Sequence, residues 1–68
     1  MKLRIEIEQE EDGRWIAEIP ELHGVLCYGT TSKEAIDRVR ALALRVVADR
    51  LENGEQVPEL DDLFAVAT

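Results

Sequence analysis

A single unbroken helix signal, residues 32 to about 52, occupies close to a third of this 68-residue chain. Thr31 can cap the first turn, and Glu34 three residues later completes a Thr-x-x-Glu capping box. Asn53-Gly54 predicts the end, because glycine is the usual residue just past a helix. The chain therefore has room for this helix and a small sheet, and we expect one domain, residues 1–68.

Helical periodicity gives this segment two apolar surfaces. At about 100° per residue, one arc would face a sheet; it contains Ala35, Ile36, Val39, Leu42, Ala43, Val46 and Val47. Leu44, Ala48 and Leu51 fall outside that arc, on the flank where Lys33 and Arg40 project. Two leucines a helical repeat apart, with alanine between them, indicate a second covered surface. We therefore expect a dimer or higher homo-oligomer whose interface uses Leu44, Ala48 and Leu51, the last apolar segment with Phe64 and Val66, or both.

The residues before the helix predict three sequential strands. Leu3, Ile5 and Ile7 alternate with charged residues over 2–10, which is typical of a strand with one wet face. Residues 11–13, Glu-Asp-Gly, predict a hairpin turn. Residues 14–19 and 25–30 are rich in strand-forming residues, and Pro20 between them ends the pairing of the second strand.

After the helix and a polar connector, residues 63–67 form a short apolar run, Leu-Phe-Ala-Val-Ala. The run has no alternation, which is consistent with a strand covered on both faces. The predicted order is β-β-β-α-β, with the last strand beside the first or at an edge. This is an α+β two-layer domain, a small sheet with one long helix packed on one face.

Charge and cysteine content limit the partners. Lys and Arg total 8 against 15 Asp and Glu, a formal charge of −7, which repels phosphate backbones and attracts basic partners. We expect no direct nucleic-acid binding, and no membrane partner because the apolar runs are too short to span a bilayer.

Cys27 alone cannot form an internal disulfide, so a second subunit is the expected support for so small a fold. A free cysteine without an export signal predicts a cytoplasmic protein.

No arrangement of side chains points plainly to catalysis. His23, the only histidine, forms no familiar dyad with Cys27, which we expect to be packed inside and inert. The aromatic residues Trp15, Tyr28 and Phe64 lie among acidic strands, which favours core packing or a protein interface over base stacking. We predict that the chain is not an enzyme and has no catalytic residue, metal site or cofactor.

The glutamates of the first two strands leave one alternative open. Glu6, Glu8 and Glu10 share a face of the first strand, and Glu18 lies on the next. Metal-dependent nucleases gather carboxylates in this way to hold two metal ions, although an ordinary solvated sheet face has the same composition. A residual metal-dependent nuclease using Glu6, Glu8 and Glu18 is therefore the enzymatic alternative.

One pattern runs through the turn, the aromatic strand, the loop and the helix start. Its residues are Asp12, Gly13, Trp15, Ala17, Pro20, Glu21, Leu22, Gly24, Gly29, Thr31, Glu34 and Ala35. In order and spacing the pattern resembles the N-terminal domain of the HicB antitoxin family, and the match extends over about two thirds of the chain. Where that family often has proline, this chain has His23.

The resemblance implies a partially degraded ribonuclease-H-like fold that keeps the sheet and one helix but lacks the catalytic carboxylates. It also implies a function, since such domains neutralise a small basic RNA-cleaving toxin, HicA, by masking its active site. Family members usually add a C-terminal DNA-binding module, which we do not expect in residues 1–68. A stand-alone domain leaves a further alternative open, an orphan oligomer of the same fold with another partner.

Overall fold

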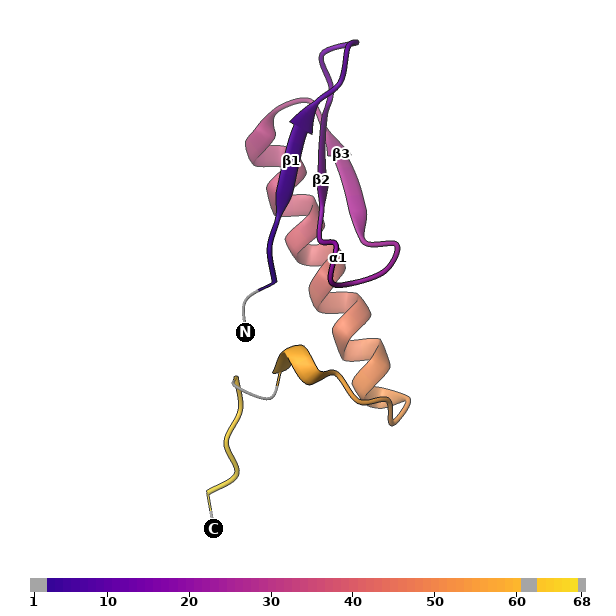
Figure 1. The fold of residues 1–68 in the computed structure, drawn as a ribbon, viewed down its shortest axis with the longest axis vertical. Helices are drawn as coiled ribbons and strands as arrows, with labels where there is room; N and C mark the ends of the chain where they lie inside the picture. Colours follow the sequence, from indigo (N-terminus) through magenta and orange to yellow (C-terminus); the bar gives the residue numbers. More distant parts are fainter. Residues whose placement is uncertain (1–2, 61–62, 68) are drawn as a thin grey trace.

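The computed structural model describes residues 3–60 and 63–67 as a sheet covered on one face by a long helix (Figure 1). The elements are β1 (Glu6–Gln9), β2 (Trp15–Glu18), β3 (Leu26–Gly29), α1 (Ser32–Glu52) and the 3₁₀ turn η1 (Pro58–Leu60). The strands form an antiparallel sheet in the order β1-β2-β3, and α1 packs mainly on β2 and β3. The predicted α+β two-layer architecture is confirmed.

Local hydrogen bonds specify both ends of α1. The Glu34 N–H donates to the Thr31 hydroxyl oxygen at 3.1 Å, and the Glu34 carboxylate accepts from the Thr30 N–H at 2.9 Å. The reciprocal bond of the capping box therefore reaches one residue further back than the sequence predicts. At the other end, the Gly54 N–H donates to the Leu51 carbonyl at 3.1 Å and the Glu55 N–H to the Arg50 carbonyl at 2.9 Å. This is a Schellman motif, and α1 ends where the sequence predicts.

The register of the sheet sorts its side chains onto two faces. Ala17 pairs with Ile7 on one side and Cys27 on the other, and Ala17 is fully buried toward α1. Because side chains alternate along a strand, the neighbouring row of Glu8, Ile16 and Tyr28 lies on the outer face. Side chains of the sheet, the helix and the loops close the core, which contains Ala17, Ile19, Leu22, Val25, Ala35, Val39, Ala43, Val47 and Val57.

The three strands are shorter than predicted, and hydrogen bonds explain the limits of β1. Before Glu6, the Arg4 N–H donates to the Glu21 carboxylate at 3.1 Å instead of to a neighbouring strand. After Gln9, the Glu10 N–H donates to the Arg14 carbonyl at 2.7 Å and closes the hairpin loop.

The predicted fourth strand at residues 63–67 is not formed. These residues pair with no strand in the described part of the chain, and their side chains are exposed rather than covered: Leu63 is 67%, Phe64 70% and Val66 91% exposed. An apolar run predicts burial, but it becomes a strand only where a sheet edge lies beside it. In Figure 1 the segment instead extends away from the sheet and helix.

Candidate partner-binding surface

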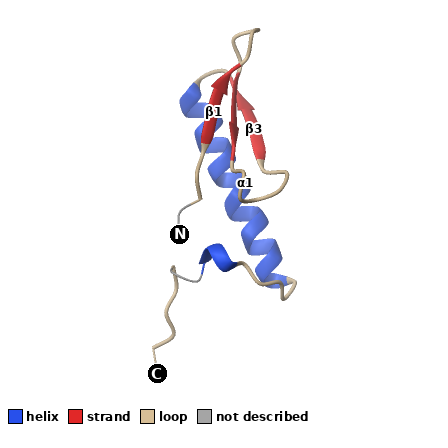
Figure 2. Cartoon of the chain, in the orientation of Figure 1, coloured by secondary structure: helices blue, strands red, loops and turns tan. Residues whose placement is uncertain are grey.

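The outer face of the sheet carries a mixed acidic and apolar surface. Two cross-strand rows form it: Glu6, Glu18 and Leu26, and beside them Glu8, Ile16 and Tyr28. The carboxylates therefore lie over β1 and its neighbour β2, and the apolar side chains lie toward β3. Figure 2 shows that α1 lies behind the sheet, so this outer face has no second layer.

Three apolar side chains form a strip on the β3 side of this face. Leu26 and Tyr28 are each 39% exposed, and Ile16, opposite Tyr28 on β2, is half-buried. The Arg14 guanidinium lies 4.6 Å from the centre of the Tyr28 ring, a cation–π contact, and its Nε donates to Asp12 at 2.8 Å. The apolar strip therefore has one charged end and remains open to a partner along its length.

Four glutamates, Glu6, Glu8, Glu10 and Glu18, concentrate negative charge beside the strip. Glu6 and Glu18 are directly opposite one another, an arrangement that disfavours the isolated sheet because the charges are alike. A shallow hollow of about 210 Å³ lies among the acidic side chains, lined by Glu6, Ile7, Glu8, Glu10, Ile16 and Glu18. The ion pairs within residues 3–60 and 63–67 are Arg4–Glu21, Arg14–Asp12, Lys33–Asp37 and Arg38–Glu34, none of which involves these four glutamates. A cationic partner would relieve this repulsion.

The residues considered for catalysis are not brought together. His23 is exposed in the loop between β2 and β3, whereas Cys27 is half-buried on the face that packs against α1. The glutamates lie on the opposite face of the sheet from Cys27. Among the described residues, no group of three or more His, Cys, Asp or Glu side chains is arranged to hold a metal ion. No helix in the same part of the chain has the length and apolar character needed to cross a membrane.

Most of the motif residues have structural roles. Ala17, Leu22, Gly29 and Ala35 are buried. Glu21 holds the loop to the N-terminal segment, because one carboxylate oxygen accepts from the Arg4 backbone N–H and from its Nε, both at 3.1 Å. The backbone hydrogen bond, together with the Arg4 side chain, holds the pKa of Glu21 below its ordinary value against the opposing effect of desolvation. The sequence does not reveal this contact, since the two residues lie 17 positions apart.

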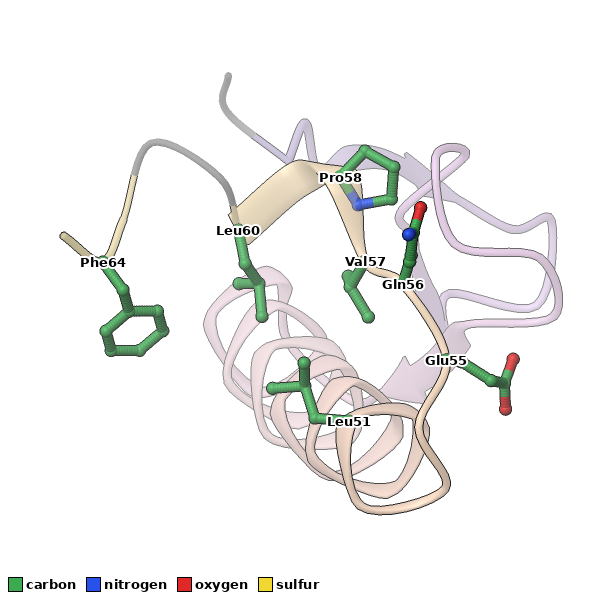
Figure 3. A pocket seen from close by; sticks show the side chains of 7 residues that line it. All are labelled: Leu51, Glu55, Gln56, Val57, Pro58, Leu60 and Phe64. Carbon is green, nitrogen blue, oxygen red and sulfur yellow. The ribbon is translucent and has the colours of Figure 1, made fainter. Parts of the chain in front are cut away.

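A second apolar surface lies on the helix layer. Leu44 is 73% and Leu51 49% exposed on the flank of α1, and Ala48 between them is exposed as well. A groove of about 500 Å³ adjoins the end of the helix and is lined by Leu51, Glu55, Gln56, Val57, Pro58, Leu60 and Phe64. Figure 3 shows Leu51 and Leu60 pointing toward one another, with the Phe64 ring beyond them. Leu44, Ala48 and Leu51 lie outside the buried face of α1, as their helical positions predict, and the oligomer interface expected there stays a prediction.

No known protein family, curated protein or solved structure matches this chain. The resemblance to HicB domains therefore depends on the motif residues alone. The outer face of the sheet is the feature from which a function can be argued, because it is exposed, partly apolar and strongly charged.

Proposed function

We propose that this chain is a non-catalytic binding protein of the HicB antitoxin type, which neutralises a small basic RNA-cleaving toxin of the HicA type by covering its active site. The observation that carries the proposal is the outer face of the sheet. There Ile16, Leu26 and Tyr28 form an apolar strip beside the carboxylates of Glu6, Glu8, Glu10 and Glu18.

This combination suits protein recognition. Apolar and aromatic side chains at the centre of an interface supply affinity when water is excluded, and charges around them select the partner. An active site that cleaves RNA must attract phosphate groups, so it presents Lys, Arg or His side chains. Those cations complement the four glutamates, whereas the strip of Ile16, Leu26 and Tyr28 would cover apolar surface beside them.

The charge of the whole chain supports the same partner. The formal charge is −7 and the sequence pI is about 4.5, so the field attracts a basic protein before contact and speeds association. RNA is repelled by the same field. The chain would therefore compete with RNA for the toxin without itself binding RNA.

A binding and protection experiment tests this proposal. The purified chain is titrated into a HicA-type toxin by calorimetry, and RNA cleavage by the toxin is followed at the same concentrations. We expect a complex and loss of cleavage at equimolar chain. Leu26→Glu should abolish both, and Arg45→Ala, on the solvent-exposed part of α1, is the matched surface control. The absence of a complex with any such toxin would contradict the proposal.

The same face favours a second candidate, a basic protein of another class. This reading corresponds to an orphan member of the fold with a different partner. A complex that forms through Leu26 but leaves RNA cleavage unchanged would identify it.

A further inference from the structure

The exposed apolar side chains on the helix layer form two neighbouring groups rather than a scatter. Leu44 (73% exposed) and Leu51 (49%) lie on one flank of α1. Leu63 (67%), Phe64 (70%) and Val66 (91%) follow in the segment after the helix. Leu51 and Phe64 line the same groove, so the two groups meet there, and exposed apolar surface of this kind marks an interaction site. The outer face of the sheet points away from α1 (Figure 2) and is a different surface.

We propose that a second copy of this chain covers the flank, with the two α1 helices antiparallel about a twofold axis at Ala48. Leu44 lies four residues before Ala48 and Leu51 three residues after it. A twofold axis at Ala48 therefore packs each Leu44 against the Leu51 of the second copy. The small side chain of Ala48 lets the two helices approach closely at the axis, and the interface is self-complementary, as a symmetric dimer requires.

Charge complementarity favours this arrangement over a parallel one. Arg45 lies three residues before Ala48 and Glu52, the last residue of α1, lies four after it, and both are exposed. Antiparallel helices bring Arg45 of each copy near Glu52 of the other, which gives two symmetric ion pairs. In parallel helices the same two residues would lie roughly 10 Å apart along the axis, and the pairing would be lost.

A stable dimer needs more buried area than the flank of α1 supplies, and the segment after the helix offers more apolar surface. A specific interface buries roughly 800 Å² on each partner. The side chains of Leu44, Ala48 and Leu51 supply only part of that area. The exposed apolar side chains of segment 63–67, of which Phe64 lines the same groove as Leu51, are available to add to the buried area.

Disulfide cross-linking tests the position of the axis. In a Cys27→Ala background, Ala48→Cys should give a covalent dimer on mild oxidation. The two cysteines would lie at the twofold axis, where their Cα atoms come within the roughly 4.4–6.8 Å that a disulfide spans. Ala41→Cys is the matched control, an exposed alanine on the same helix. In antiparallel helices the two copies of position 41 lie roughly 21 Å apart along the axis, so this variant should stay uncross-linked. Cross-linking of both variants, or of neither, would overturn the proposal.

Sedimentation equilibrium at micromolar concentration gives an independent test. The chain should have twice its 7.7 kDa mass. Leu44→Glu should raise the dimer dissociation constant by about 100-fold, since burial of a leucine is lost in both copies. Leu26→Glu, a matched change on the outer sheet face, should leave the mass unchanged. A wild-type monomer, or a dimer unaffected by Leu44→Glu, would overturn the proposal while leaving the toxin-binding proposal intact.

Discussion

The backbone at Gly29 lies directly against the backbone at Ala35. A Cβ atom built on Gly29 would be only 2.5 Å from the Ala35 nitrogen and 3.0 Å from its Cα. The end of β3 and the first turn of α1 can therefore touch only because position 29 has no side chain. This contact gives a physical reason for the glycine of the motif.

The first prediction is that Gly29→Ala destabilises the fold by about 2–4 kcal/mol, because the atoms it would strike belong to backbone that cannot move aside. Gly13→Ala is the control. Gly13 has φ +93° but open space around it, so only backbone strain opposes the change, about 1–2 kcal/mol. Urea denaturation followed by circular dichroism measures both variants. Equal losses would contradict the close contact at position 29.

The second prediction contrasts a buried leucine with an exposed one. Leu22, 1% exposed, turns inward from the loop after Pro20, and its loss leaves a cavity that neighbouring side chains cannot fill. Leu22→Ala should therefore cost about 2–5 kcal/mol. Leu44→Ala should leave the stability of the monomer within about 0.5 kcal/mol, because Leu44 is 73% exposed. The comparison is made by thermal unfolding at concentrations low enough to exclude dimers. A larger loss for Leu44→Ala would contradict the packing described.

Both ends of the helix were predictable from the sequence, because Thr31 and the Asn53-Gly54 pair specify them through bonds within a few positions. The three strands before the helix were predictable in order but not in length, and the fourth strand predicted at residues 63–67 was wrong. The limit of β1 depends on the Glu21 carboxylate, which reaches Arg4 across 17 positions. Residues 63–67 show the same difficulty in a stronger form, since a strand requires a partner and local sequence does not supply one.

The candidate surface was predictable only in part. Alternation in β1 places Glu6 and Glu8 on one face, and this follows from the sequence alone. That Ile16 and Tyr28 lie in the same row as Glu8 depends on the register of three strands. The hairpin and the loop fix that register through hydrogen bonds. The pattern of each strand gives no sign of it.

The third prediction concerns acid stability. Hydrogen bonds from backbone N–H groups lower the pKa values of three carboxylates, Asp12 from Arg14, Glu21 from Arg4 and Glu34 from Thr30, and an ion pair with Lys33 lowers that of Asp37. A carboxylate with a lowered pKa in the folded state stabilises the fold fully above its unfolded pKa, and that stabilisation is lost as the pH falls through the folded value. The ordinary values are 3.8 for Asp and 4.5 for Glu. Stability should therefore decline below about pH 4.5.

Thermal unfolding between pH 7 and pH 2.5 measures this decline. Glu34→Gln removes a charge that accepts from the Thr30 N–H and pairs with Arg38, so its unfolding temperature should depend less steeply on pH than that of the wild type. Gln56→Ala, which changes an exposed side chain without a titratable group, is the control and should keep the wild-type slope. Identical slopes for all three proteins would contradict the role given to Glu34.

The last prediction separates the contributions of charge and apolar contact on the outer sheet face. Glu8→Lys with Glu18→Lys changes the formal charge from −7 to −3, because each reversal adds two positive charges. The association rate with a basic toxin should fall by about tenfold at low salt, and the remaining rate should vary less with salt, since the loss is one of steering. Leu26→Glu should instead speed dissociation, because it places a charge in the apolar strip. Stopped-flow and surface-binding kinetics resolve the two effects. The same changes in both rates for the two variants would show that the acidic and apolar parts do not have these distinct roles.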